Sequence, residues 1–265
     1  MPHGYPLPHG YQEFPAHWPV GHPVEADWSY LAAADGLHRV LPDGRIDLIA
    51  HFRLAADDTV SGLQLLIAGP STGHFMVPVT AGLGFIGLRF RAGWGGACLG
   101  LDPATVRDTN LDDAQVQALL GERLAPVRSA KDLATLHTAL RSLATELASA
   151  AGSSAHPQAQ AAIDLLHVSG GRLPVVALAE QVGCSERHLR RTMRQAVGLP
   201  VKTLAAILRF QRTARLLRAD PTLSLSAAAC EGGYSDQAHM ARDFRRLGGF
   251  SPSDRAQVTH GDLPL

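Results

Sequence analysis

The sequence contains little cysteine and no long apolar run. Its three cysteines, Cys98, Cys184 and Cys230, form no CxxC pair, and their odd number argues against both a disulfide framework and a cysteine-rich zinc site. No window approaches the roughly 18 uninterrupted apolar residues that a membrane-spanning helix needs. Residues 1–23 also lack the basic, apolar and small-residue order of a secretory signal. We therefore expect a cytoplasmic location and no membrane partner.

Motifs that would support catalysis are missing as well. A cupin-type metal site needs an HxH pair, so that several imidazoles converge on one ion, and no HxH occurs in the chain. Nor is there a Gly-rich phosphate loop, a GxSxG elbow or a Cys/His nucleophile pattern. The isolated His38, His51 and His74 are more typical of hydrogen-bonded residues than of ligands. The sequence predicts no enzyme, catalytic residue, metal or cofactor; a metalloenzyme on a β-barrel is the competing hypothesis.

The net charge of zero hides an asymmetry between the two halves. Residues 1–155 carry 10 basic and 15 acidic side chains, whereas residues 156–260 carry 14 basic and 8 acidic ones. A basic domain is typical of proteins that bind a polyanion, because lysine and arginine release counterions condensed on its phosphates. A solvated surface gives the same excess, so charge alone leaves both interpretations open.

The N-terminal half shows the two-residue alternation of β-strands. Residues 1–24 are rich in Pro, Gly and His and predict a poorly ordered lead-in. Residues 25–108 then alternate apolar and polar side chains, with Asp43-Gly44 as a predicted hairpin turn. In the last predicted strand Arg89 and Arg91 share one face and Trp94 follows closely, while Asp43, Arg45 and Asp47 alternate on another strand. These residues are weak candidates for a ligand pocket, whereas strand arginines usually occupy the solvent side of a sheet. The pattern predicts a small barrel or sandwich, with strands around 46–48 and at 63–68, 75–79 and 85–90.

From residue 109 the period changes to that of helices. Residues 109–151 place five leucines at three- and four-residue spacing, namely Leu133, Leu136, Leu140, Leu143 and Leu147. Such a stripe fits a coiled seam between two subunits, and it fits an intramolecular core equally well. The small and polar segment 150–157 is the plainest linker in the chain. We therefore place the main domain boundary there and a second domain at residues 156–260.

Residues 173–198 predict a helix-turn-helix unit. Gly183 suits the left-handed turn that stops a first short helix, and Ser185 can cap the helix that follows. One face of that helix is apolar, and arginines on the other can bind guanine O6 and N7 in a major groove through two parallel hydrogen bonds. Short patterns of this kind also arise by chance on helices with solvated arginines. The four guanidinium groups belong to Arg187, Arg190, Arg191 and Arg194.

A second copy of the pattern follows. A short helix at residues 224–231, a Gly232–Tyr234 turn and a capping Ser235 or Asp236 precede a helix that runs to about Leu247. Its outer face carries Gln237, Ala238, Ala241, Arg242, Arg245 and Arg246.

The connector between the two units, residues 201–218, contains no Gly or Pro. As a helix it would span roughly 27 Å, so together with the helix widths it can seat both units in major grooves about 34 Å apart. Arg209, Arg212 and Arg215 recur on it at three-residue spacing and predict a ridge along phosphates.

These motifs, in this order and at these separations, resemble the arabinose-regulator (AraC/XylS) family. The resemblance covers about residues 160–257 and rests on VALAEQVGCSERHLRRTMRQAVGLP, RFQRTARLL and GGYSDQAHMARDFRRLGGFSP. It implies a separate N-terminal domain, often a cupin-like barrel, that senses a small molecule or mediates dimers. LHRVLPDGRIDLI and LRFRAGWGGACLGL resemble such a domain of some bacterial members. The implied base-reading positions are Arg187, Arg190 and Arg191 in the first unit and Gln237, Ala238, Ala241 and Arg242 in the second.

The second unit departs from the family pattern. Ala228 and Gly232 stand where relatives usually carry larger aliphatic residues, and Ala238 and Ala241 stand where relatives often carry polar ones. These departures imply a second unit that is less well packed and reads fewer bases than the first.

Together these observations predict an α+β protein. A β-rich, barrel-like or cupin-like sensing domain (25–108) and a helical linker or dimerisation segment (109–151) precede an all-α domain with two helix-turn-helix units joined by a long helix. The predicted function is sequence-specific transcription regulation, modulated by an effector or by dimerisation. Double-stranded DNA is the expected partner; RNA polymerase, an unidentified small molecule and a second copy of the chain are further candidates. The expected DNA contacts are Arg187, Arg190, Arg191, Arg194, Arg209, Gln237, Ala238, Ala241, Arg242 and Arg246.

Overall fold

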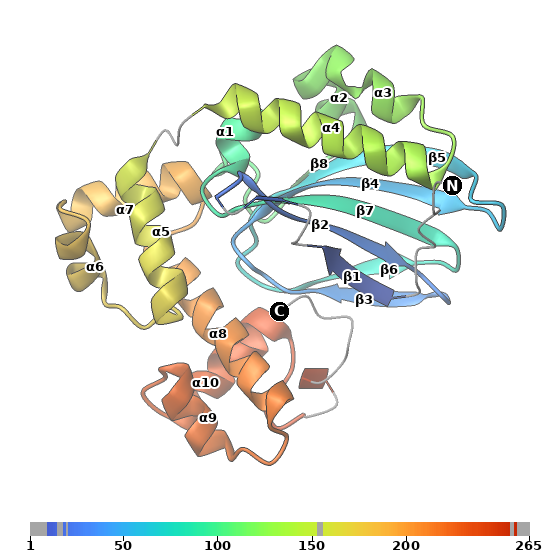
Figure 1. Cartoon of the computed structure of the whole chain (residues 1–265). Helices are drawn as coiled ribbons and strands as arrows, with labels where there is room; N and C mark the ends of the chain where they lie inside the picture. Colours follow the sequence, from blue (N-terminus) through green and yellow to red (C-terminus); the bar gives the residue numbers. More distant parts are fainter. Residues whose placement is uncertain (1–9, 15–17, 20, 153–155, 255–256, 259–265) are drawn as a thin grey trace.

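The computed structural model describes residues 10–14, 18–19, 21–152, 156–254 and 257–258. It has a β-rich N-terminal domain and a helical C-terminal domain (Figure 1), as the sequence predicted. Six antiparallel strands form the main sheet in the order β1-β2-β7-β4-β5-β8. Their bounds are β1 Gly10–Phe14, β2 Val24–Leu31, β7 Leu83–Phe90, β4 Ile46–Leu54, β5 Val60–Ala68 and β8 Asn110–Leu111. A second sheet pairs β3 (Gly36–Val40) with β6 (Phe75–Val79).

Two expectations for the N-terminal half are wrong. Residues 10–14 of the predicted lead-in form the edge strand β1, which pairs with β2 from Gly10 to Phe14; residues 1–9 of the lead-in lie outside the described residues. Asp43-Gly44 is not a hairpin turn, because the strands on either side of it belong to different sheets. Strand β3 pairs instead with β6, some 35 residues further along the chain.

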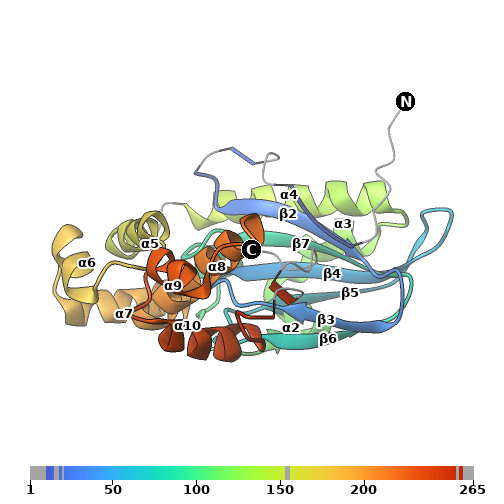
Figure 2. The ribbon, with the colours of Figure 1, turned by 90° about the horizontal axis from the view of Figure 1, so that it is seen from below.

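Helices cover one face of the main sheet (Figures 1 and 2). They are α1 (Gly95–Leu99), α2 (Asp113–Leu120), α3 (Ala125–Arg128) and the long α4 (Leu133–Ala151). The five leucines of α4 are at most 3% exposed and pack on apolar strand residues such as Leu48 and Leu88. Of the two interpretations of this stripe, the structure therefore favours the intramolecular core over a seam between subunits.

Each Leu→Ala change in this stripe of α4 should cost about 2–5 kcal/mol of folding free energy.

The opposite face of the sheet holds a buried ion cluster. Arg89 and Asp47 are each 8% exposed, and Arg89 Nη2 lies 3.1 Å from Asp47 Oδ2. Asp47 also accepts a 2.8 Å hydrogen bond from Trp28 Nε1, and Arg89 Nε lies 3.3 Å from Asp43 Oδ2. The prediction that Arg89 occupies the solvent side of the sheet is therefore wrong. His38 of the small sheet contacts Tyr30 of β2, with ring centroids 4.5 Å apart and ring planes tilted by 39°, so β3 lies against this same face.

The C-terminal domain consists of helices around one apolar core. The helices are α5 (Pro157–Ser169), α6 (Val175–Gln181), α7 (Glu186–Val197), α8 (Val201–Ala219), α9 (Leu225–Gly232) and α10 (Gln237–Asp243), with a π-helical turn η3 (Phe244–Gly248) continuing α10. Phe210 of α8 packs edge-on against Phe244 at a centroid distance of 4.9 Å. This aromatic pair attaches the second half of the domain to the connecting helix.

None of the helices in the described part of the chain combines the length and apolar character that a membrane crossing requires.

Helix α8 runs between the two halves of the helical domain and along the edge of the β-rich domain (Figures 1 and 2). The buried core of the helical domain includes Leu41 and Ala92 from the other domain. The two domains therefore share apolar contacts rather than a linker alone.

Candidate nucleic-acid interface

The first helix-turn-helix unit consists of α6, a glycine turn and α7. Gly183 has a φ of +68°, which an L side chain rarely adopts, so the sharp turn needs glycine at this position. Ser185 then caps α7 by accepting a 3.2 Å hydrogen bond from the backbone N–H of His188. Leu189, Met193 and Val197 are buried. The local structure of this unit confirms the sequence prediction.

The other side of α7 is open to solvent and strongly basic. Arg187, Arg190, Arg191 and Arg194 are all exposed. Arg190 pairs with Glu186 one turn earlier, and Arg191 Nη2 lies 3.2 Å from His188 Nδ1. An exposed pair of this kind is worth at most about 1 kcal/mol. The guanidinium groups are therefore free to exchange these partners for a polyanion.

The second unit repeats this construction with α9, α10 and η3. Ser224 caps α9 through the backbone N–H of Ala227 at 3.1 Å, and the left-handed residue of the turn is Gly233, with φ +85°. Asp236, rather than Ser235, caps α10 by accepting a 2.6 Å hydrogen bond from the N–H of His239. That hydrogen bond stabilises the carboxylate and lowers the pKa of Asp236. Most of the residues of this second unit that are expected to face DNA are exposed, namely Gln237, Ala238, Arg242 and Arg246, and Ala241 is half-buried.

The packing of the second unit differs from the expectation drawn from Gly232 and Ala228. A Cβ at Gly232 would collide with the hydroxyl of Thr213 on α8, and Ala228 is fully buried. The small residues at these positions allow α9 to approach α8 closely. The inference that small residues leave this unit loosely packed is therefore wrong at Gly232, where Thr213 fills the space.

The three arginines of the connecting helix have different neighbours. Arg209 Nη1 donates a 2.7 Å hydrogen bond to the carbonyl of Gly171, and Arg212 Nε donates to the carbonyl of Glu231 at 3.2 Å. Arg215 lies near Arg45 of the β-rich domain, and burial together with that neighbouring cation lowers the pKa of Arg215. Arg215 is nevertheless exposed, and the ridge along phosphates stays a prediction.

Two basic residues that sequence reasoning missed, Arg172 and Lys202, are exposed beside the first unit. They line one cleft together with Arg190 and Arg209. The only signal for them in the sequence is the basic excess of the C-terminal half, because the fold brings these four residues together from three separate segments. Within the described residues no three His, Cys, Asp or Glu side chains come together to hold a metal ion.

Comparisons with known proteins show which families and proteins this chain is similar to. Residues 178–257 match a family described as a helix-turn-helix domain. Over 87 residues the chain is 36% identical to the HTH-type transcriptional activator RhaS of Escherichia coli (strain SE11), a match that covers 33% of this chain and 31% of the relative. These similarities agree with the resemblance of residues 160–257 to the AraC/XylS family. The relative that the chain matches is named as a transcriptional activator. The chain spans about a third of the length of the curated relative that it matches.

Solved structures are similar to this chain over different extents. The C-terminal domain of AraT, a response regulator from Geobacillus stearothermophilus, is 23% identical with a TM-score of 0.37, covering 43% of this chain and 92% of that one. ToxT from Vibrio cholerae is 9% identical with a TM-score of 0.48, covering 95% of this chain and 100% of that one. Residues 12–112 match a second family, a domain of unknown function (DUF6597). The β-rich domain thus has relatives without an assigned role.

Proposed function

We propose that this protein is a sequence-specific transcription regulator that places α7 and α10 in adjacent major grooves of one DNA duplex. The observation that carries the proposal is the pair of capped helices, each with exposed guanidinium groups, on one rigid connector. Helix α8 has 19 residues and is therefore about 28 Å long. With the width of the flanking helices, this length suits grooves that lie about 34 Å apart on one side of B-DNA. The 36% identity of 87 residues of the chain with a transcriptional activator supports the proposal.

Selection of binding sites from random duplex DNA by the full chain tests this arrangement. We expect two short conserved blocks whose centres lie about 10 base pairs apart, one for each unit. The blocks should differ in sequence, because α7 presents four arginines whereas α10 presents glutamine, two alanines and arginine. The proposal of two reading helices on one duplex would be abandoned if selection returned a single block or no enrichment.

The β-rich domain contacts the two units at equivalent positions, which supports its part in regulation. Gly198 ends α7 with φ +78°, and Gly249 ends η3 with φ +73°. A Cβ at Gly198 would lie 2.5 Å from the carbonyl oxygen of Pro103, and a Cβ at Gly249 would overlap the ring of His74. Pro103 and His74 both belong to the β-rich domain. Each reading helix therefore ends against a different loop of that domain.

A third contact holds the connector between these two points. Gln211 of α8 is buried, and its Nε2 donates a 3.0 Å hydrogen bond to the carbonyl of Pro42. Because one domain touches both units and the helix that joins them, a change of shape in it would alter their spacing. Protein interiors are close-packed and transmit such shifts. We infer that an effector or a partner of the β-rich domain acts on DNA binding through these three contacts.

The Pro103 loop also brings a carboxylate to the reading face of α7. Asp102 lines one cleft of about 610 Å³ together with Arg190, Arg191 and Arg194. Its Oδ1 accepts a 2.9 Å hydrogen bond from the backbone N–H of Ala104, which fixes the loop. A carboxylate in this position repels DNA phosphates that approach the same arginines. The docked arrangement of the two domains is therefore expected to weaken DNA binding.

Replacing this carboxylate should strengthen DNA binding. We expect Asp102→Asn to raise the affinity of the full chain for DNA about threefold, the size of one exposed charge interaction. The amide keeps an acceptor for Ala104, so the loop conformation should survive. Fluorescence anisotropy at low and high salt measures the effect, which salt should screen. Asp58→Asn, an exposed change in the β4–β5 turn, is the matched control; equal affinities of the two variants at low salt would contradict the role of Asp102.

A further inference from the structure

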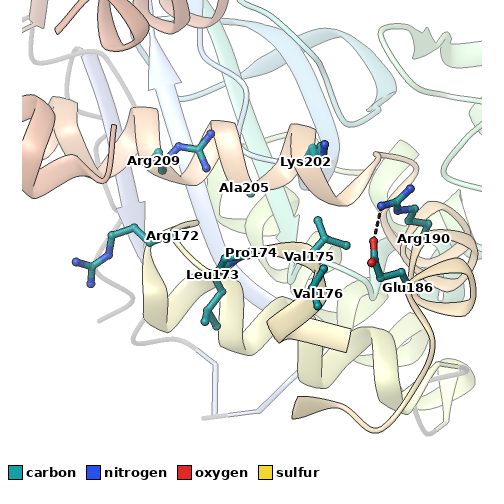
Figure 3. A pocket seen from close by; sticks show the side chains of 10 residues that line it. All are labelled: Arg172, Leu173, Pro174, Val175, Val176, Glu186, Arg190, Lys202, Ala205 and Arg209. Carbon is teal, nitrogen blue, oxygen red and sulfur yellow. Dashed lines mark hydrogen bonds and ion pairs between the residues drawn. The ribbon is translucent and has the colours of Figure 1, made fainter. Parts of the chain in front are cut away.

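A cleft of about 510 Å³ opens beside the first unit, between the segment that precedes α6, the start of α7 and the first half of α8 (Figure 3). Figure 3 shows Lys202 and Arg209 on α8 along one side, Arg172 on the other side, and the Glu186–Arg190 pair at one end. Strands of the β-rich domain lie behind α8 in this view. The lining residues are Arg172, Leu173, Pro174, Val175, Val176, Glu186, Arg190, Lys202, Ala205 and Arg209.

The polar lining of the cleft is strongly cationic. It contains four cations and one carboxylate, and that carboxylate, on Glu186, is paired with Arg190. Arg209 is held in place by the hydrogen bond that its Nη1 donates to the carbonyl of Gly171. Its Cζ also lies over the ring of Tyr234, 5.7 Å from the ring centroid. Its buried Nε has no hydrogen-bond partner among the described residues. Arg172, Lys202 and Arg209 thus leave three positive charges around the cleft without a carboxylate partner in it.

The rest of the lining is apolar. Leu173, Pro174, Val175 and Val176 form a continuous segment of the lining, and Val176 is 53% exposed. An exposed apolar surface rimmed by cations fits a ligand with alternating anionic and apolar parts. The sugar-phosphate backbone of DNA has this character, because each phosphate is followed by a deoxyribose with a C–H surface.

The position of the cleft also favours the DNA backbone. It is bounded by α7, the first reading helix, and by α8, which leads to the second unit. A duplex that offers one major groove to each unit must pass its backbone across α8 between them. We propose that this cleft, here called the backbone cleft, binds the phosphodiester backbone between the two major grooves, with Arg172, Lys202 and Arg209 as its phosphate ligands. The inference rests on the proposed function.

Such contacts fix the position of the protein on DNA without reading its sequence. Each phosphate contact contributes about −0.9 to the slope of log affinity against log salt concentration. Losing one contact therefore makes the slope shallower by about 0.9 and weakens binding about eightfold at 0.1 M salt. We therefore expect Lys202→Gln and Arg172→Gln each to weaken binding about eightfold, equally for the selected site and for scrambled DNA. The ratio of the two affinities should stay unchanged, in contrast to changes in base-reading residues. Lys131→Gln, an exposed change just before α4, is the control.

The lysine content of the chain allows a second, independent readout. Lys131 and Lys202 are the only lysines in the sequence, and both are exposed. Acetylation of the full chain with and without the selected duplex, followed by mass spectrometry, compares the two directly. DNA should slow the acetylation of Lys202 severalfold and leave that of Lys131 unchanged.

The outcomes separate this inference from the proposed function. If the unmodified protein does not distinguish its selected site from scrambled DNA, the proposed function fails. If it does distinguish them, but Lys202→Gln and Arg172→Gln keep the full salt slope and DNA leaves Lys202 open to acetylation, the backbone cleft alone is overturned. A variant that weakens binding only to the selected site would also overturn it, because that residue would then read bases.

Discussion

The Arg190→Ala/Arg191→Ala variant is expected to lose about a thousandfold of its preference for the selected DNA site. Both guanidinium groups are exposed on the outer face of α7, and their present partners are Glu186 and His188 of the same helix. A bidentate contact with guanine is worth about 2 kcal/mol of discrimination, so two such contacts account for about 4 kcal/mol, or nearly a thousandfold. Fluorescence anisotropy with selected and scrambled duplexes at fixed salt gives this ratio. The helix itself should persist, because its buried stripe and its Ser185 cap are untouched.

A matched control removes two guanidinium groups elsewhere. Arg53 and Arg123 are exposed in the β-rich domain, so Arg53→Ala/Arg123→Ala changes the net charge equally without touching α7. We expect this control to keep the full preference. If the control and the α7 variant lose specificity equally, or if neither loses any, α7 does not read bases.

Arg89→Met is expected to destabilise the β-rich domain by about 3–5 kcal/mol, because it removes the cation from a buried cluster and leaves carboxylates uncompensated. Burial already raises the pKa of Asp47, and Arg89 opposes that rise. Without Arg89 the folded-state pKa of Asp47 should rise further. Protonated Asp47 contributes stability that is fully present below its unfolded-state pKa. This stability is lost as pH rises through the raised folded-state pKa of Asp47. The defect should therefore shrink as pH falls from 7 towards 4.

Tryptophan fluorescence during urea unfolding measures this loss, because all three tryptophans, Trp18, Trp28 and Trp94, precede the helical domain. Adding Asp47→Asn to Arg89→Met should restore part of the stability at pH 7, since the buried charge then disappears with its partner. Arg53→Met, an exposed change near the end of β4, should change the free energy of unfolding by less than about 0.5 kcal/mol. If Arg89→Met lowered the free energy of unfolding as little as Arg53→Met does, and by the same amount at every pH, the cluster would not be a structural ion pair.

Features set by neighbouring residues were predictable from the sequence. The cap Ser185, the turn at Gly183 and the buried stripe of α7 all depend on contacts within a few residues. The sequence also predicted that Arg187, Arg190, Arg191 and Arg194 share one face, because helical periodicity alone decides this.

Features set by distant partners were not predictable. Alternation placed Arg89 on one side of its strand, but it cannot show whether another element covers that side. Here Tyr11 of β1 and the carboxylates Asp43 and Asp47 enclose it. The turn at Asp43-Gly44 failed for a related reason, since β3 pairs with β6 rather than with the next strand. Arg172 and Lys202 come together only through the fold, and no spacing in the sequence relates them.

The central claim is that the full chain distinguishes one DNA sequence from another. The measurement that tests it most directly is the affinity of the full chain for its selected duplex and for a scrambled duplex of the same composition at 0.15 M salt. Specific regulators prefer their sites by about a thousandfold or more, and we predict a ratio in that range for this protein. Equal affinities that fall together with added salt would contradict the account, because they would show a basic domain that binds DNA without reading it.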